Sequence, residues 1–262
     1  MPVLLFGATG KLGSRLLPAL LAHKQKVVVY VRNELKLREL IPSTILSQVT
    51  VVNGDATDSK SIGNALVQHE CDSLINSAGT ASVLPWSEPQ MQNIIRAVAT
   101  GAVDASKELN RPIRAWFLGG MSILDIPGMV GTQLLNYLPI FTEHNLTYIC
   151  LSDLPQKNLQ WSMFCPSQMA PASKTITLLD VPRGNPLNAS ADVPPGFQNS
   201  YLHNIPYFGP FFSIVGNGYK YGTILEDCAD FLAADLENKD TKFVGRRVGV
   251  IDAGSEGKGK TE

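Results

Sequence analysis

The chain has little charge of either sign and no dense run of basic residues, and this shortage excludes several classes of protein. Asp, Glu, Lys and Arg make up only 17% of the 262 residues, and the formal net charge is −1. Binding to nucleic acid or to an anionic membrane would require Lys and Arg clustered on one face. We therefore expect neither nucleic acid nor a membrane as a partner.

Cysteine and long apolar runs are also scarce. The four cysteines are far apart and form neither a CxxC pattern nor a Cys/His spacing, so no metal site and no disulfide framework are indicated. No apolar run reaches the ~18 residues that a membrane span requires. No basic segment followed by an apolar stretch and a cleavage site precedes the first predicted strand. We expect a cytoplasmic protein with reduced thiols and no bound metal.

Short apolar runs alternate with helical patterns through the first half of the chain. This order is typical of βαβ units and of a parallel sheet covered on both faces. We expect strands at residues 3–6, 27–31, 49–52, 72–76, 115–118 and 161–165. We expect helices at residues 12–23, 34–40, 59–69, 89–109 and 139–151. The predicted fold class is α/β, a doubly wound parallel sheet.

The regular alternation ends after Pro166. Residues 170–217 are rich in Pro, Gly, Asn and Ser, which is typical of long loops and short elements. A helical pattern at 223–238 and a strand pattern at 243–251 follow, and the tail from residue 254 is rich in Gly, Lys and Glu. We expect a small irregular C-terminal part that binds the substrate.

A glycine-rich turn follows the first predicted strand and opens the first predicted helix. Its residues are Gly7, Ala8, Thr9, Gly10, Lys11, Leu12 and Gly13. This context distinguishes a dinucleotide-binding fingerprint from incidental glycines. Gly7 would permit the tight turn, Gly10 the approach of a pyrophosphate, and Gly13 the close packing of helix on strand. The backbone amides and the dipole at the helix start would attract the anion.

The end of the second predicted strand favours one cofactor over another. An NAD-binding protein would offer an Asp or Glu about 20 residues after the first glycine, but this chain has Arg32 there. A guanidinium holds a 2′-phosphate through paired charge-assisted hydrogen bonds. The sequence therefore favours NADP(H), and Lys11 could add a second positive charge.

Together these motifs resemble the short-chain dehydrogenase/reductase superfamily, in its atypical NmrA-like branch, which includes fungal oxidoreductases of the averufin oxidase type. The resemblance covers nearly the whole chain, through GATGKLG at 7–13, GDATD at 54–58, NSAG at 76–79, GGMS at 119–122, WSMFCP at 161–166 and EDCAD at 226–230. It implies a Rossmann core at 1–169, substrate-covering loops at 170–222, a helix and strand completing the core at 223–253, and a flexible tail at 254–262.

The same resemblance implies the path of the cofactor. Asp55 and Ala56 would contact the adenine. Ser77, Ala78 and Gly79 would run along the adenosine ribose and the phosphates. Residues 166–169, with Pro166 and Met169 at their ends, would flank the nicotinamide. All of these segments follow predicted strands, which is where open α/β sheets bind ligands.

The catalytic residues of the superfamily are only partly matched. Ser122 corresponds to the serine that orients the substrate carbonyl. The usual proton-donating Tyr has a Lys four residues later, whereas Tyr137 and Tyr148 are followed at that position by Phe141 and Ser152. Counting back from Trp161 instead places Glu143 and Thr147 near the usual pair.

Another set of groups is offered by the predicted helix at 139–151. Tyr137, His144 and Tyr148 are spaced by seven and four residues, which would place them on one face of a continuous helix. His144 is the plausible proton donor among them, because an unperturbed imidazole titrates near pH 6.5. We name Ser122, His144 and Tyr148 as catalytic candidates, although each could instead be structural.

Aromatic residues gather in the irregular C-terminal part, together with His203. They are Tyr201, Tyr207, Phe208, Phe211 and Phe212, and such rings suit a flat apolar ligand or form a small core. The leading hypothesis is an NADPH-dependent oxidoreductase acting on a carbonyl, imine or conjugated alkene of an aromatic or alkaloid-like secondary metabolite. The alternatives are a cyclase or isomerase on the same scaffold and a non-catalytic NADP(H) sensor. The sequence leaves the oligomeric state open.

Overall fold

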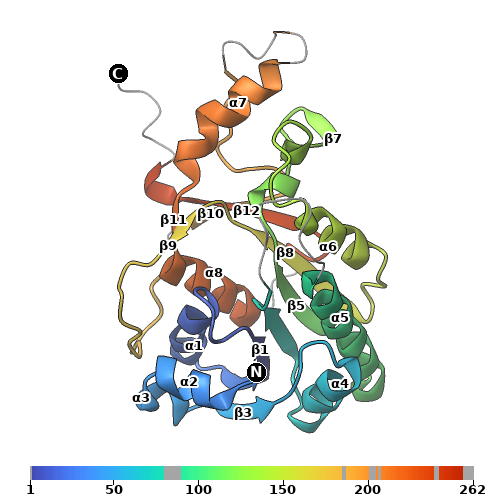
Figure 1. The fold of residues 1–262 in the computed structure, drawn as a ribbon, viewed down its shortest axis with the longest axis vertical. Helices are drawn as coiled ribbons and strands as arrows, with labels where there is room; N and C mark the ends of the chain where they lie inside the picture. The colour runs from blue at the N-terminus through green and yellow to red at the C-terminus, as the bar shows by residue number, and fades with distance from the viewer. Residues whose placement is uncertain are drawn as a thin grey trace.

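Strands and helices alternate in the computed structural model as the sequence pattern predicts, and the strands form one large sheet (Figure 1). The structure describes residues 2–79, 90–184, 187–200, 205, 208–238 and 242–255. The 8-stranded sheet has the order β10-β12-β8-β5-β4-β1-β2-β3. Its strands are β1 (Pro2–Phe6), β2 (Lys26–Val31), β3 (Thr50–Asn53), β4 (Ser73–Asn76), β5 (Ile113–Leu118), β8 (Leu159–Cys165), β10 (Leu187–Ala191) and β12 (Arg247–Asp252).

All neighbouring strands in this sheet run parallel except β10, which is antiparallel to β12 at the edge. The chain starts in the middle, because β1 pairs with both β2 and β4. The strand order therefore reverses at β1, which is the topological switch point where such sheets bind ligands. This confirms the predicted doubly wound α/β fold.

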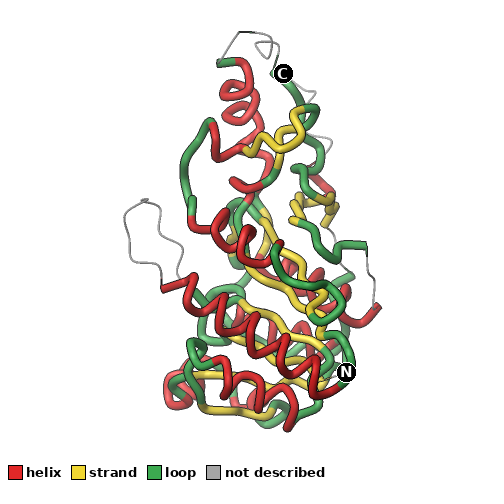
Figure 2. Tube along the Cα trace, turned by 90° about the vertical axis from the view of Figure 1, so that its right-hand side faces the viewer, coloured by secondary structure: helices red, strands yellow, loops and turns green. Residues whose placement is uncertain are grey.

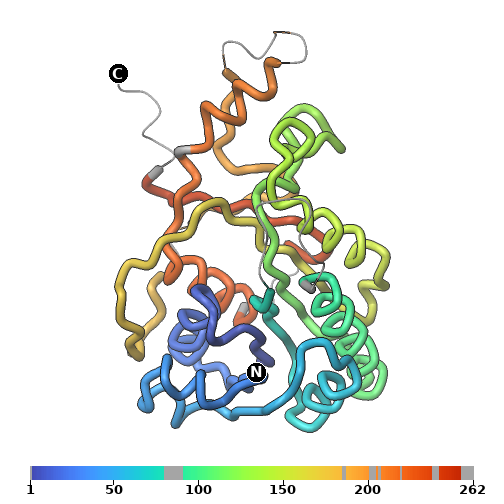
Figure 3. Tube along the Cα trace, viewed as in Figure 1, coloured from blue at the N-terminus to red at the C-terminus, as the bar shows by residue number. Residues whose placement is uncertain are grey.

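Helices cover both faces of the sheet. They are α1 (Gly13–Ala22), α2 (Glu34–Leu40), α3 (Ser43–Leu46), α4 (Ser59–Gln68), α5 (Gln90–Leu109), α6 (Glu143–Ser152), α7 (Gly209–Gly218) and α8 (Leu225–Asn238). Side chains of α4, α5 and α6 share one hydrophobic core, and those of α1, α2, α3 and α8 share the other. Figure 2 shows the long helix α5 lying across the strands, and Figure 3 shows α8 beside α1 although the chain separates them widely.

The strands supply both cores because successive side chains point to opposite faces. In β1, Val3 and Leu5 pack in the core with α1, whereas Leu4 and Phe6 pack in the core with α5. All four side chains are fully buried. This two-sided burial explains why the strands appear in the sequence as continuous apolar runs rather than alternating patterns.

Three predicted elements begin two to four residues later than expected. The helix predicted from residue 139 begins at Glu143, because Phe141 has φ +54°, which an α-helix does not accommodate. The helix predicted from residue 223 begins at Leu225, because Thr223 and Ile224 form a short strand, β11, paired with β9 (Met169–Ala170). The strand predicted from residue 243 begins at Arg247, because Gly245 has φ +74° in a preceding turn.

The C-terminal half also contains elements that the local pattern does not reveal. A hairpin of β6 (Asp125–Ile126) and β7 (Met129–Gln133) follows β5, and α7 and β10 lie within the stretch expected to be mainly loops. In Figure 1, α7 and the β6–β7 hairpin lie at the end of the molecule beyond β12, away from β1 to β3. Among the described residues, no helix combines the length and apolar character that crossing a membrane requires.

Candidate functional site

The glycine-rich turn joins β1 to α1 in a conformation that requires glycine. Gly7 has φ +80°, and a Cβ there would lie 2.6 Å from the amide nitrogen of Ala78. A Cβ on Gly13 would overlap the carbonyl oxygen of Gly7, so the helix start lies directly against the turn. No side chain caps α1, but the amides of Ser14, Arg15 and Leu16 donate to the carbonyls of Gly10 and Leu12, so an anion would meet the chain just before Ser14.

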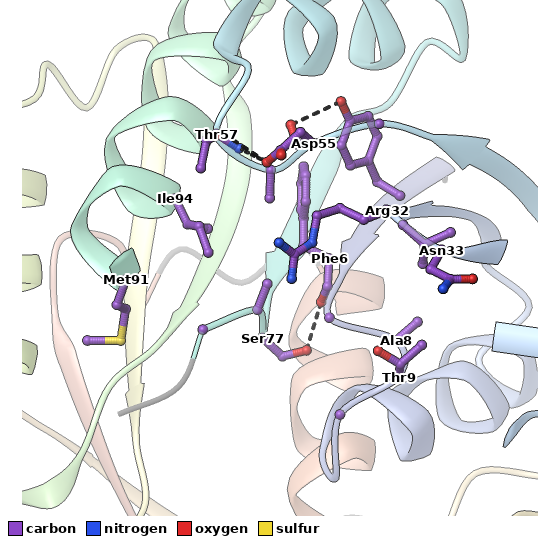
Figure 4. Close-up of a pocket in the computed structure, with 18 of the residues that line it drawn as sticks. Phe6, Ala8, Thr9, Arg32, Asn33, Asp55, Thr57, Ser77, Met91 and Ile94 are labelled. Carbon is purple, nitrogen blue, oxygen red and sulfur yellow. Dashed lines mark hydrogen bonds between the residues drawn. The ribbon is translucent and has the colours of Figure 1, made fainter. Parts of the chain in front are cut away.

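A groove with a volume of about 620 Å³ follows the carboxyl ends of β1, β2, β3 and β4 (Figure 4). Most of the predicted cofactor residues line it: Gly7, Thr9, Gly10, Arg32, Asp55, Ala56, Ser77, Ala78 and Gly79. Leu12 and Gly13 are buried behind the turn, and Lys11 is exposed but does not line the groove. The groove therefore joins four loops that are far apart in the sequence.

Two basic side chains line the groove at the end of β2. Figure 4 shows the Arg32 guanidinium directed into the cavity, and Lys36 lines the same space from α2. The nearby acid Glu34 is engaged elsewhere, because it accepts hydrogen bonds from Asn53 Nδ2 and Arg38 Nε, both at 2.9 Å. These bonds lower the pKa of Glu34. The end of β2 therefore presents positive charge to the groove.

The loops after β3 and β4 are held by short local hydrogen bonds. Asp55 Oδ1 accepts from the amide and the hydroxyl of Thr57, at 2.9 and 2.8 Å, and these bonds lower the pKa of Asp55. Ser77 donates to the carbonyl of Phe6 at 2.7 Å, which ties the loop after β4 to β1. The groove walls are thus fixed by the protein's own contacts.

Residues 166–169, predicted to flank the nicotinamide, follow β8 and lie beside the chain after β5 that carries Ser122. The amide of Gly119 donates to Phe164 O at 2.7 Å, and that of Met121 donates to Pro166 O at 3.0 Å. Met169 follows in β9. Neither Pro166 nor Met169 lines the 620 Å³ groove. Ser122 lies in the turn after β5, and its Oγ is buried without a hydrogen-bond partner among the described residues.

His144 lies at the start of α6 and packs against the chain after β5. Its ring lies so close to Gly120 that a Cβ there would be 2.7 Å from His144 Cδ2. Only 6% of the residue is exposed, and burial lowers its pKa to about 4, against a small opposing effect of Glu143. His144 is therefore neutral at pH 7, which gives no support to the prediction that it donates a proton as an imidazolium.

Tyr148 lies one turn further along α6 and faces away from the groove. Its ring packs edge-on against Trp161 at 6.2 Å, and the guanidinium carbon of Arg247 lies 4.6 Å from the ring centre. Trp161 is four residues before the end of β8, a distance of roughly 13 Å along a strand. Tyr137 lies outside α6, next to a short turn. The predicted shared face of three side chains does not form.

Burial of His144 predicts a measurable pH dependence of stability. Because its folded-state pKa of about 4 lies below the unfolded value, the unfolded chain takes up the proton first, and stability falls as the pH drops from 6.5 towards 4. We expect His144 to contribute a loss of about 2 kcal/mol between pH 7 and pH 5. Urea unfolding at both pH values should show that His144→Gln removes this difference, whereas the control His69→Gln retains it. Equal pH dependence in the two variants would contradict the assignment.

Several residues that line the groove were not predicted from the sequence. They are Phe6, Ala8, Tyr30, Val31, Asn33, Lys36, Gly54, Thr57, Met91, Asn93 and Ile94. Lys36 could have been found as the basic residue in the first helical turn after Arg32. Met91, Asn93 and Ile94 come from the start of α5, and only the packed structure brings that helix beside β1 and β4.

The aromatic residues expected to cover the substrate are only partly described. Tyr201, His203 and Tyr207 lie outside the described residues. Phe208 precedes α7 and is 62% exposed, and Phe212 within α7 is 37% exposed. The described aromatic side chains therefore present an apolar surface.

Comparison with known proteins agrees with this geometry. Residues 7–107 match the model of a family described as NAD(P)H-binding. This stretch begins at Gly7 and contains the turn, β2 to β4 and most of α5, so the chain carries an NAD(P)H-binding domain. No curated protein matches the chain.

Solved structures share the fold over almost the whole chain. An anaerobillin reductase from Escherichia coli is 18% identical with a TM-score of 0.57, covering 96% of this chain and 97% of that one. A short-chain dehydrogenase/reductase from Veillonella parvula is 15% identical with a TM-score of 0.59, covering 97% and 95%. An oxidoreductase from Lactococcus lactis is 13% identical with a TM-score of 0.60, covering 96% and 91%. The chain thus shares its α/β fold with these three structures.

Proposed function

We propose that this protein is an NADPH-dependent oxidoreductase. The observation that carries the proposal is the pair of cations, Arg32 and Lys36, lining the groove where an NAD-binding protein offers a carboxylate. A 2′-phosphate placed there would accept charge-assisted hydrogen bonds from both side chains. The ribose hydroxyl of NADH would leave both cations without a partner.

The protein's own residues would bind and orient the reactants. The amides at the start of α1 and the loops after β3 and β4 would hold the dinucleotide, which supplies the hydride when bound. Ser122 would orient an acceptor oxygen: its Oγ has no described partner to compete, but it is sealed from solvent, so the chain around it would have to open for a substrate. Neither His144 nor Tyr148 is placed to supply the proton, so we assign that step to water.

The proposed substrate is an apolar aromatic or alkaloid-like small molecule with a carbonyl, imine or conjugated alkene. The exposed rings of Phe208 and Phe212, and the absence of charged residues in α7, support an apolar ligand. The test is NADPH oxidation across a panel of such compounds. Tight NADPH binding without turnover of any of them would overturn the oxidoreductase and favour a sensor.

Ser122→Ala is expected to lower turnover about tenfold while leaving NADPH affinity unchanged, because one hydrogen bond to the reacting oxygen is lost. Steady-state rates and calorimetric titration would separate the two effects. Ser43→Ala is the matched control, since this exposed serine lies outside the groove. A Ser122→Ala variant with full turnover would remove Ser122 from the mechanism.

A second candidate function is cyclisation or isomerisation in the same pocket. It is favoured by the positions of His144 and Tyr148, which leave no described side chain in the role of the superfamily's Tyr/Lys pair. Product formation that is independent of NADPH would favour a non-redox isomerase. Product formation that requires stoichiometric NADPH would support the reductase.

A further inference from the structure

A second cavity lies at the opposite edge of the sheet from the cofactor groove. Its volume is about 340 Å³, and it is enclosed by the β6–β7 hairpin, α6, the chain after β10 and the start of β12. Residues 245–247 lead into β12, so this cavity lies at the amino end of that strand, whereas the cofactor groove follows carboxyl ends. The two cavities share no lining residue.

Arg247 lines this cavity with an incompletely bonded guanidinium. The residue is only 5% exposed. Its Nη1 donates to Ile123 O at 2.6 Å and to Asp125 Oδ1 at 3.0 Å, and its Nε donates to Asp192 Oδ1 at 3.4 Å. Nη2 has no hydrogen-bond partner among the described residues, and it is not one of the buried atoms sealed from solvent. A deeply buried side chain therefore keeps one donor group available.

Burial by itself lowers the pKa of Arg247, but the hydrogen bond from Arg247 to Asp125 and the charges around it outweigh burial and raise the pKa overall. The guanidinium is therefore a permanent donor. Because Nη2 reaches solvent, it can bond to water in the free protein, and an acceptor atom from a ligand would replace that water.

Tyr148 brings a second unused hydroxyl to the same cavity. Its ring is fixed between Trp161 and the Arg247 guanidinium. Its hydroxyl has no hydrogen-bond partner among the described residues and is not sealed from solvent. The two donor groups thus belong to side chains in direct contact, on walls that are held rigidly by α6 and β12.

The charges around the cavity balance. Arg246 Nη1 pairs with Asp192 Oδ2 at 2.8 Å, and Arg247 bonds both Asp125 and Asp192. A carboxylate ligand would meet two carboxylates already present, whereas a neutral acceptor would meet no repulsion. A carboxamide also has N–H groups, which could donate hydrogen bonds to the carboxylate of Asp125 or Asp192. The side chains of Val130 and Val193 provide an apolar wall for the rest of the molecule.

We propose that this cavity binds a small neutral molecule bearing a carboxamide group. The carboxamide oxygen accepts hydrogen bonds from Arg247 Nη2 and the Tyr148 hydroxyl, and the apolar body lies against Val130 and Val193. The cavity is at the lower end of the size range of small-molecule sites. This site is separate from the proposed oxidoreductase site and does not depend on it.

The test is ligand-observed fluorine NMR on the full chain with 4-fluorobenzamide and 4-fluorobenzoate, which differ only in the charged group. We expect broadening of the benzamide signal but not of the benzoate signal, and no displacement of the benzamide by saturating NADPH. Equal broadening of both probes, or displacement by NADPH, would overturn the proposal.

Matched variants locate the binding. Tyr148→Phe removes a hydroxyl that bonds nothing in the fold, so it should leave the protein folded and weaken 4-fluorobenzamide binding about fivefold. Tyr137→Phe makes the same change at a half-buried residue outside the cavity, and should leave binding unchanged. Equal affinities in the two variants would remove Tyr148 from the site and contradict the proposal.

Discussion

Gly7→Ala is expected to lower the affinity for NADPH by at least about 100-fold, equivalent to about 3 kcal/mol. Gly7 has φ +80°, and its added Cβ would lie 2.6 Å from both the amide nitrogen of Ala78 and the carbonyl carbon of Ser77. These are backbone atoms that cannot rotate away. The loops after β1 and β4 would have to separate, and both form walls of the cofactor groove. Calorimetric titration with NADPH measures the effect.

A matched control separates backbone strain from this collision. Gly131 has a similar φ of +78°, but a Cβ there would meet nothing within 4 Å. Gly131→Ala should therefore lose about 1 kcal/mol of folding stability from strain alone and retain NADPH binding. Urea unfolding and titration of both variants give the comparison. A folded Gly7→Ala protein that binds NADPH as the parent does would contradict the assignment of the turn.

Replacing both Arg32 and Lys36 by alanine is expected to weaken NADPH binding about 100-fold and to leave NADH binding within about threefold of the parent. Both side chains line the groove at the end of β2, and each would lose a charge-assisted hydrogen bond to the 2′-phosphate. Since NADH has no such phosphate, its affinity should not depend on these residues. Titration of each variant with both dinucleotides measures the selectivity.

The control for this pair is Lys26→Ala. Lys26 is an exposed cation at the opposite, amino end of β2, and it does not line the groove. It should leave the affinity for both dinucleotides unchanged. Equal losses of NADPH and NADH affinity in the double variant would show that the cations contribute only general structure or charge.

Much of the fold was predictable because local apolar patterns coincide with the buried elements. The runs at β1, β2 and β4 are buried on both faces, so each appears in the sequence as a short apolar segment. The errors occur where distant contacts decide the conformation. Thr223 pairs with Met169, and Phe243 lies in a turn where the centre of its ring is 6.2 Å from that of Trp116. The residues next to these two positions in the sequence therefore do not reveal whether each lies in a helix, a strand or a turn.

The candidate site, like the fold, could be predicted only in part from the sequence. The glycine spacing and Arg32 were recognisable from the sequence, because their chemistry follows from their position after a strand. Lys11 was predicted as the second cation but lies outside the groove, whereas Lys36, in the first turn of α2, lines it. His144 and Tyr148 share a helix face, but α6 runs alongside β8, so one approaches Gly120 and the other Trp161.

The central claim is that the groove recognises the 2′-phosphate of NADPH. Its most direct test is the ratio of the dissociation constants for NADH and NADPH, measured by calorimetry on the unmodified chain. The two cations predict a preference for NADPH of at least about 30-fold, since two charge-assisted hydrogen bonds are gained. Equal affinities, or a preference for NADH, would contradict this account.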